Sequence, residues 1–272
     1  MEKILEKAME SKKYIEEKIN IKPKIAIILG SGLGKFVEKI EEKVELAYEE
    51  IPNFPVSTIV GHSGKLITGK INNIEIMAMS GRFHYYEGYS MAEATFPIRV
   101  FSLLGVEKLI ITNAAGGVNE QFDAGELMVI TDHIKFSNET PLRGKNIEEF
   151  GTRFPDMRNC YNKEMIEKLK QTANKIDIKL NEGVYFYMAG PQYETPSEVR
   201  MIRLLGGDAV GMSTVPEAIV ANHCGMKILG ISCITNTLRE NTEVVTHEEV
   251  MENGNKAANN FAKLVTEFLK EI

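Results

Sequence analysis

The chain has 272 residues, of which 43% are hydrophobic and 26% charged, an ordinary globular composition that is long enough for one or two domains. Its formal net charge of −6 offers no general basic surface to nucleic acid or an anionic membrane, and no apolar run is long enough to span a bilayer. The three cysteines are odd in number and form no CxxC pair, and the charged N-terminus lacks the apolar core of a signal segment, so we expect a cytoplasmic protein.

Helical and strand-like patterns alternate along the chain. In order, they predict a helix at 2–19, a strand at 24–29, a hairpin at 65–81, a helix at 90–105, strands at 108–117 and 126–134, a helix at 162–176, a strand at 183–189, a helix at 195–207, a short strand at 208–210, a helix at 214–225, a strand at 227–236 and a helix at 246–272. Asn72 and Asn73 supply the hairpin turn, and Pro97 kinks or breaks the helix that contains it.

Four of these helices begin with a capping box, in which a Ser or Thr is followed three residues later by Glu. The pairs are Ser90–Glu93, Thr195–Glu198, Thr214–Glu217 and Thr246–Glu249. Strands that alternate with helices at this spacing predict an α/β fold, with a mixed, mostly parallel central sheet flanked by helices. Because the sequence contains no repeat, low-complexity segment or linker, we expect one domain over residues 1–272.

Six predicted strands end in glycine, serine, asparagine or a charged residue. These ends lie at 30–34, 80–84, 113–117, 190–194, 211–213 and 235–236. One or two such ends are typical of plain turns, since glycine interrupts any chain. Six together indicate a ligand site, because ligands of open α/β sheets bind beyond the carboxyl ends of the strands.

The residue types at these ends narrow the chemistry. Arg82 carries a planar fork suited to a tetrahedral oxyanion, although a single arginine is about as often simply solvated. The GSGLG turn matches no common nucleotide motif and taken alone indicates a plain turn, but it also presents backbone N–H groups and the Ser31 hydroxyl. Glu194 and Asn236 add a carboxylate and an amide. The set favours phosphate at one end of the site and a heterocycle at the other.

Other chemistries find less support. The five histidines form no HxxxH or HxH pair and no cysteine pair completes a site, so we predict no metal. A serine hydrolase is disfavoured because no GxSxG elbow occurs. Paired carboxylates of a glycosidase remain open, but Glu194 is the only carboxylate among the six strand ends.

Nine segments, in order across nearly the whole chain, carry a resemblance. They are ILGSGLG (28–34), IPNFPVSTIVGHSGKL (51–66), SGRFHYYEGYS (80–90), ITNAAGGVN (111–119), FGTRFPDM (150–157), AGPQYETPSEVR (189–200), DAVGMSTVPEAIVANHCGMK (208–227), SCITN (232–236) and HEEV (247–250). Through them the chain resembles the trimeric, low-molecular-mass class of purine nucleoside phosphorylases, with their phosphorylase/hydrolase-like fold. The resemblance implies reversible phosphorolysis of 6-oxopurine (deoxy)nucleosides such as inosine and guanosine to the free base and (deoxy)ribose 1-phosphate. It implies no cofactor, since inorganic phosphate is a substrate.

Carried over position by position, the resemblance implies two halves of one site. Phosphate would be held by Ser31, Arg82, His84, the backbone N–H of Ala114, and Ser213, with His62 on a nearby loop. The nucleoside would be held by Tyr86, Val210, Met212 and His247 around the sugar and by Tyr193, Glu194 and Asn236 around the base. His84, Glu194 and Asn236 would be catalytic, and Phe154 would close the sugar pocket of a neighbouring subunit in a homotrimer.

Several alternatives stay open from the sequence. A methylthioadenosine phosphorylase shares the fold and phosphate site, but Glu194 with Asn236 favours a 6-oxopurine, because a carboxylate accepts from N1–H and meets only an acceptor at N1 of adenine. A non-catalytic nucleoside-binding protein is a remote second alternative. Position 193 is Tyr where many members of the family carry Phe. For His247, the alternative to a role in binding the sugar is that of a solvated histidine at the start of a helix.

Overall fold

The computed structural model describes residues 2–56, 64–239 and 247–272. The helices are α1 (Glu2–Lys18), α2 (Met91–Ala94), α3 (Phe96–Leu103), α4 (Lys163–Lys175), α5 (Pro196–Leu204), α6 (Val215–His223) and α7 (His247–Phe268). The strands are β1 (Ile25–Leu29), β2 (Glu41–Ala47), β3 (Lys65–Ile71), β4 (Ile74–Ser80), β5 (Lys108–Gly117), β6 (Leu127–Lys135), β7 (Leu180–Tyr187), β8 (Ala209–Gly211) and β9 (Lys227–Thr237). Among the described residues, none of the helices is long and apolar enough to cross a membrane.

The described strands form one mixed sheet, in the order β2-β3-β4-β1-β5-β8-β7-β6-β9. Strand β9 also pairs with β5, which closes β5, β8, β7, β6 and β9 into a ring, while β1, β4, β3 and β2 extend from β5 as an open sheet. Strands β4, β1, β5 and β9 are parallel to one another. Strands β8, β7 and β6 run the opposite way.

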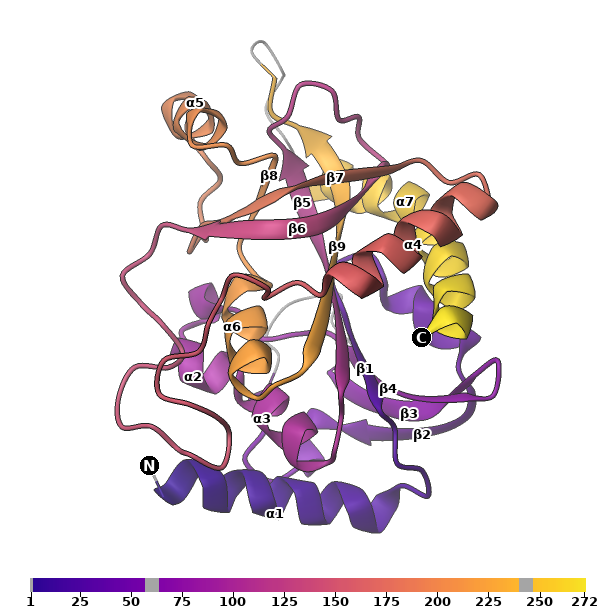
Figure 1. Ribbon diagram of the computed structural model, residues 1–272, viewed down its shortest axis with the longest axis vertical. Helices are drawn as coiled ribbons and strands as arrows, with labels where there is room; N and C mark the ends of the chain where they lie inside the picture. Colours follow the sequence, from indigo (N-terminus) through magenta and orange to yellow (C-terminus); the bar gives the residue numbers. More distant parts are fainter. Residues whose placement is uncertain (1, 57–63, 240–246) are drawn as a thin grey trace.

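Helices cover both sides of this sheet (Figure 1). Helices α1, α3 and α6 pack next to one another on one side, and α4 and α7 pack together on the other, where α7 lies along β9. Helix α5 stands at the far end of the molecule from α1, beside the ring of strands (Figure 1). The predicted single α/β domain with a mixed, mostly parallel sheet flanked by helices is confirmed.

Local sequence explains the elements that were predicted. The five residues of β1 are apolar and all are buried. Asn72 and Asn73 both have positive φ, 51° and 64°, as a two-residue hairpin turn with the twist of its strands requires. The predicted helix with an internal Pro97 is broken at Thr95 into α2 and α3, and Ser90 accepts from the backbone N–H of Glu93 at 3.2 Å as its box predicts.

Two details differ from the sequence prediction. Strand β2 was not predicted, because most of its residues are exposed and its apolar alternation is confined to Val44 and Leu46. Strand β7 begins at Leu180, three residues before the predicted strand. The capping contact predicted between Thr246 and Glu249 lies outside the described residues.

Candidate active site

The strand ends singled out by sequence meet, but they do not all share one edge of the sheet. The prediction of a common carboxyl edge holds for β1, β4, β5 and β9 and is wrong for β7 and β8, which run the other way. Strand β8 pairs antiparallel with Gly116 and Gly117 at the far end of β5, so its own end turns back beside Asn113. The site is therefore built around Thr112 and Asn113 in the middle of β5, where segments arrive from both directions.

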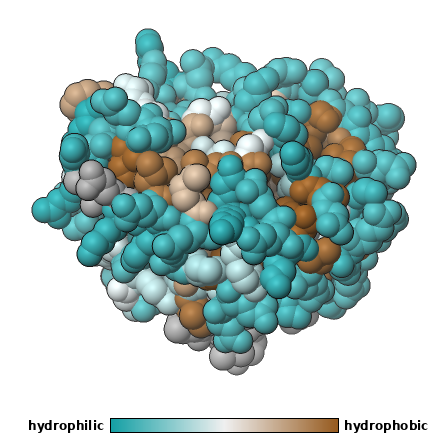
Figure 2. Space-filling model, turned by 90° about the horizontal axis from the view of Figure 1, so that it is seen from below, coloured by the Kyte–Doolittle hydropathy of each residue, from teal (hydrophilic) through white to brown (hydrophobic). Residues whose placement is uncertain are grey.

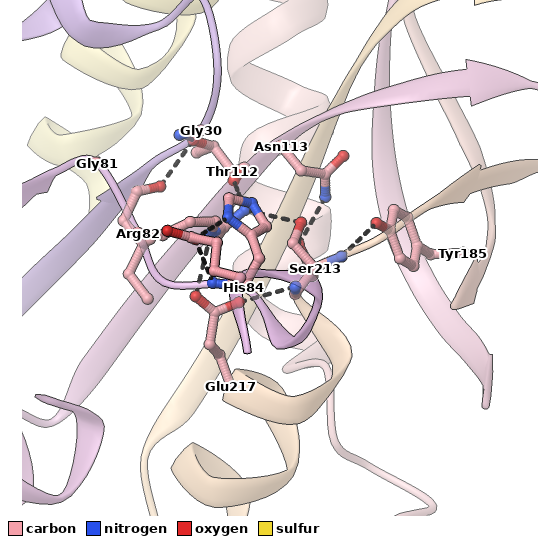
Figure 3. A network of polar contacts seen from close by, with 12 residues as sticks. Gly30, Gly81, Arg82, His84, Thr112, Asn113, Tyr185, Ser213 and Glu217 are labelled. Carbon is pink, nitrogen blue, oxygen red and sulfur yellow. Dashed lines mark hydrogen bonds and ion pairs between the residues drawn. The ribbon is translucent and has the colours of Figure 1, made fainter. Parts of the chain in front are cut away.

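Arg82 lies at the centre of these segments and is 1% exposed. Its Nη1 donates to the carbonyl oxygen of Thr112 at 2.7 Å and to Oγ of Ser213 at 2.9 Å (Figure 3). Its Nε donates to Oε1 of Glu217 at 3.1 Å. The guanidinium thus joins β5, the end of β8 and helix α6, and the alternative of a solvated surface arginine is excluded.

Ser213 is presented by a strained turn. The backbone N–H of Val215 donates to the carbonyl of Ser213 at 2.7 Å, which closes a γ-turn whose central residue, Thr214, has φ 72° and ψ −52°. A non-glycine residue in this region costs on the order of 1–3 kcal/mol. The Thr214 hydroxyl accepts from Nδ2 of Asn113 at 2.9 Å, so only the Glu217 half of the predicted capping box forms.

Thr112 ties the end of β1 to β5. Its hydroxyl donates to the carbonyl of Ile28 at 2.7 Å and accepts from the N–H of Gly30 at 3.1 Å. A Cβ at Gly30 would come within 2.7 Å of the Cα of Asn113, so only glycine permits this approach. The glycine-rich turn, with Ser31 half-buried, therefore starts directly against the strand that Arg82 contacts.

His84 is held by a buried carboxylate. Its Nδ1 lies 2.9 Å from Oε1 of Glu87, whose side chain is 2% exposed, and its backbone N–H donates to the same oxygen at 2.8 Å. Because a carboxylate only accepts, the hydrogen is assigned to Nδ1, and Nε2 faces the other way. The imidazole stacks on the ring of Tyr86 at 4.7 Å between centroids.

Two of the residues implied for the sugar, Tyr86 and Met212, both lie against Gly190. A Cβ at Gly190, where φ is 68°, would collide with the sulfur of Met212 and come within 3.2 Å of the Tyr86 ring. The turn after β7, the end of β8 and the Tyr85–Glu87 turn therefore meet at this glycine. Burial raises the pKa of Tyr86 to about 12, so its hydroxyl stays protonated and can donate.

The residues implied for the base are more open. Asn236 is half-buried at the end of β9, and its Oδ1 accepts from the Thr235 hydroxyl at 3.0 Å. This assigns Nδ2, which lies next to Gly116, as its outward donor. Burial, followed by repulsion from Glu198, raises the pKa of Glu194. Tyr193 is 54% exposed.

The remaining predicted residues are placed differently. Phe154 is 85% exposed and contacts the guanidinium of Arg153. Val210 is buried in a small apolar cluster, so contact with a nucleoside stays a prediction. Ala114 is half-buried on β5. His62 lies outside the described residues, and of His247 only its place at the start of α7 is described.

Glu217, Glu87 and Thr112 are parts of the site that the sequence prediction missed. The first was predicted only as a helix cap, and the second stands inside the GRFHYYEGY segment without having been singled out. In the portion of the chain that the structure describes, no group of three or more His, Cys, Asp or Glu side chains is placed to hold a metal ion. The described site is thus a cluster of buried hydrogen-bonding groups around Arg82.

Comparison with known proteins agrees with this architecture. The model of the phosphorylase superfamily matches residues 24–270. Purine nucleoside phosphorylase 1 of Bacillus subtilis is 53% identical over 253 residues, which cover 93% of each chain. The structure of a schistosoma purine nucleoside phosphorylase with hypoxanthine superposes with a TM-score of 0.93 at 37% identity, covering 98% of this chain and 97% of that one. The structure of the Schistosoma mansoni enzyme with adenosine gives 0.93 at 38%, with the same coverage.

Proposed function

The chain belongs to the phosphorylase superfamily and has purine nucleoside phosphorylase activity, and on this premise we propose how its residues divide the reaction. In this reaction an oxygen of inorganic phosphate attacks C1′ of the nucleoside and the bond from C1′ to the purine breaks. The products are the free purine and ribose 1-phosphate.

The observation that carries the proposal is the convergence of Arg82, Ser213 and His84 beside the middle of β5. A guanidinium, a hydroxyl and an imidazole held in fixed positions form a cradle for a tetrahedral anion. Ser31 and the backbone N–H of Ala114 complete it in the proposal. We call this group, Ser31, Arg82, His84, Ala114 and Ser213, the phosphate cradle.

The cradle is tested by the dependence of the reaction on phosphate. We expect inosine to be consumed when phosphate is present and to be stable when it is absent. Arg82→Ala should cost about 2–4 kcal/mol, or roughly two to three decades in kcat/KM for phosphate, because a charge-assisted contact is lost. Consumption of inosine without phosphate, or an unchanged phosphate dependence in the variant, would remove Arg82 from the site.

Glu87 sets the role of His84 in the proposal. With its Nδ1–H donated to Glu87, the imidazole can donate to phosphate only through a protonated Nε2. The buried carboxylate therefore fixes the orientation of the ring, so that Nε2 is the atom left to meet a phosphate oxygen.

The base side supplies the other half of transition-state stabilisation. As the bond to C1′ lengthens, positive charge grows on the sugar and negative charge on the purine. Bound phosphate stabilises the first charge, and a hydrogen bond from Nδ2 of Asn236 to N7 stabilises the second. Both interactions strengthen as the bond breaks, which is the condition for catalysis.

We propose that 6-oxopurine nucleosides are the preferred substrates. Glu194 would accept from N1–H of hypoxanthine or guanine, whereas adenine presents only an acceptor at N1. Tyr193 would cover the base. The sugar would be held by Tyr86, Met212 and His247. We would measure the rate at which inosine, guanosine, adenosine and methylthioadenosine are consumed, each with and without phosphate. The order of these rates shows which nucleoside the enzyme prefers. A preference for methylthioadenosine would overturn the assignment.

We also propose a homotrimer in which Phe154 closes a neighbouring site. Its support is the exposure of large apolar side chains that a lone chain does not cover, among them Phe136, Phe154 and Leu204. Figure 2 shows separate apolar areas within a mostly hydrophilic face of the molecule. Light scattering at assay concentration should give three chains, and an active, stable monomer would contradict the proposal. The cytoplasmic location stays a prediction from the sequence.

A further inference from the structure

Glu217 is a buried carboxylate that joins a local hydrogen-bond partner, Thr214, to one that is 135 positions away in the chain, Arg82. Its side chain is 7% exposed. Its Oε1 accepts from Nε of Arg82 at 3.1 Å, and its Oε2 accepts from the backbone N–H of Thr214 at 2.8 Å (Figure 3). One oxygen thus orients the arginine of the phosphate cradle, and the other fixes the strained turn that presents Ser213.

The other capping glutamates show that this arrangement is special to α6. Oε2 of Glu93 accepts from the backbone N–H of Ser90 at 2.8 Å and from its hydroxyl at 2.7 Å, and both contacts are exposed. Glu198 accepts from the backbone N–H of Thr195 at 2.7 Å, also at an exposed position. A cap alone therefore needs neither burial nor an arginine, since within the described part of the chain neither Glu93 nor Glu198 is ion-paired to an arginine.

Arg82 needs a fixed orientation because its guanidinium is planar. Nη1 already donates to Thr112 and Ser213, and these two bonds lie at one side of the fork. The bond from Nε to Glu217 fixes the opposite side, so that rotation about the last side-chain bonds would break contacts at both sides. A carboxylate is the strongest acceptor for this purpose, because its hydrogen bonds to a cation are charge-assisted.

The same carboxylate controls Ser213 through the turn. Thr214 has a backbone conformation that costs energy, and such conformations persist only where several contacts enforce them. The contacts that hold Thr214 include the bond from its N–H to Glu217, the bond from Asn113 to its hydroxyl, and the bond from the N–H of Ala218 to its carbonyl. Of these side-chain partners, Glu217 is the one that also reaches Arg82. Without Glu217 we expect the turn to relax and the Ser213 hydroxyl to leave the guanidinium.

We propose that Glu217 is a positioning residue for phosphate, which sets the relative placement of Arg82 and Ser213 without itself contacting the anion. The inference rests on the proposed phosphate cradle and deepens it. A carboxylate would repel phosphate if it faced the anion, so its place behind the guanidinium is the one that helps binding. Removing it leaves a buried, poorly oriented cation and a relaxed serine.

The first experiment compares Glu217→Gln with Glu93→Gln. Glutamine has one acceptor oxygen and one NH2 group, so it loses either the Arg82 contact or the Thr214 contact together with the charge. We expect KM for phosphate to rise about tenfold or more in Glu217→Gln, with KM for inosine changed less than about threefold. Glu93→Gln, which also loses a capping carboxylate, should leave both constants unchanged. Equal rises in both KM values, or a fall in stability with normal KM for phosphate, would overturn the proposal.

The second experiment is a double-mutant cycle with Arg82→Ala. If Glu217 acts by aiming Arg82, then Glu217→Gln should raise KM for phosphate much less in the Arg82→Ala background than in the wild type. Additive effects would overturn the proposal. Should Glu217→Gln not fold, Glu217→Asp keeps the charge but is one methylene shorter, and it should raise KM for phosphate in the same direction.

The two proposals fail in different ways. If Arg82→Ala impairs phosphate use and Glu217→Gln does not, the phosphate cradle stands and the role of Glu217 is wrong. If neither variant affects phosphate use, the cradle itself is wrong. Direct titration of the free enzyme with inorganic phosphate gives the same distinction without turnover.

Discussion

Tyr185 and Tyr187 lie two residues apart on β7 and differ in their hydrogen bonding. Both are fully buried. The hydroxyl of Tyr185 accepts from the backbone N–H of Ser213 at 3.4 Å. The hydroxyl of Tyr187 has no partner among the described residues and belongs to a side chain that lines a narrow pocket beside His84 and Met212. Burial raises the pKa of both phenols, so each remains a neutral donor.

We expect Tyr187→Phe to stabilise the protein. A buried hydroxyl without a partner carries a desolvation cost of about 1–3 kcal/mol, and phenylalanine removes the hydroxyl while keeping the ring. The free energy of unfolding from urea titration should rise by about 1 kcal/mol, with activity nearly unchanged. Tyr185→Phe is the matched control and should not stabilise, because it removes an acceptor that Ser213 uses. A loss of stability in Tyr187→Phe would show that its hydroxyl is satisfied.

Asn236 is the residue at which base specificity is most directly tested. Thr235 fixes its oxygen, so its amide group donates outward, which suits N7 of a purine. In Asn236→Asp this donor becomes a carboxylate, which repels N7 unless protonated and can accept from a 6-amino group. The ratio of kcat/KM for inosine to that for adenosine should fall about tenfold or more, since one polar mismatch is worth roughly 1–3 kcal/mol. An unchanged ratio would mean that Asn236 does not read the base.

The segment before Phe154 depends on one glycine. Gly151 has φ 148°, and a Cβ there would collide with the backbone carbonyl oxygen of His223 at the end of α6. Its own carbonyl accepts from Nδ2 of Asn146 at 2.9 Å, and the ring of His223 lies 3.2 Å from Oδ1 of the same asparagine. This glycine therefore allows the segment to dock on the helix that carries Glu217.

Gly151→Ala should displace that segment. A clash with backbone cannot be relieved by a side-chain movement, so we expect a loss of more than about 2 kcal/mol in the free energy of unfolding. KM for inosine should rise if Phe154 is misplaced with it. Gly125→Ala is the control, since Gly125 also has positive φ but a Cβ there would meet nothing within 4 Å. Equal losses in the two variants would show that the contact with His223 is unimportant.

Regular elements could be predicted from sequence because their signals are local. The apolar run of β1, the paired asparagines of the β3–β4 hairpin and the box at Ser90 each act within a few residues. Strand β2 carries only a short signal, Val44 and Leu46 between charged residues, and its pairing to β3 is interrupted by a register shift between Glu41 and Val44. The direction of β8 was also missed, because a three-residue strand takes its direction from its neighbours.

The site could be predicted only in part, because sequence patterns report local structure and not contacts between residues that are far apart in the chain. The resemblance identified Arg82, His84 and Ser213, and the structure brings Arg82 and Ser213 into contact. It gave no account of Glu217, whose partner Arg82 is 135 positions away in the chain. The capping pattern correctly predicted that Glu217 accepts a hydrogen bond at the start of α6. The burial of Glu217 and its ion pair with Arg82 exist only after the chain has folded.

Across the molecule, the closed ring of strands explains why groups from both chain directions reach one place. Strand β5 belongs to both the open sheet and the ring, and it pairs with β1, β8 and β9. Segments that follow β1, β4 and β8 therefore all meet it at Thr112 and Asn113. A site at this junction is held by the most central strand of the fold, so we expect its backbone to be among the last parts of the chain to exchange amide hydrogens.

In the phosphate cradle the cation Arg82 is paired with the carboxylate of Glu217, and His84 lies against the carboxylate of Glu87, within a chain of net charge −6. These two carboxylates leave the cradle without a net positive charge, so it exerts no long-range attraction on an approaching anion. Binding of phosphate therefore depends on short-range hydrogen bonds. Between about 0.01 M and 1 M sodium chloride the Debye length falls from roughly 30 Å to 3 Å. Over that range kcat/KM for phosphate should change less than about threefold, whereas a steered encounter would slow steeply. The rate at which phosphate encounters this site would then be that of diffusion without electrostatic steering, and it would not depend on ionic strength.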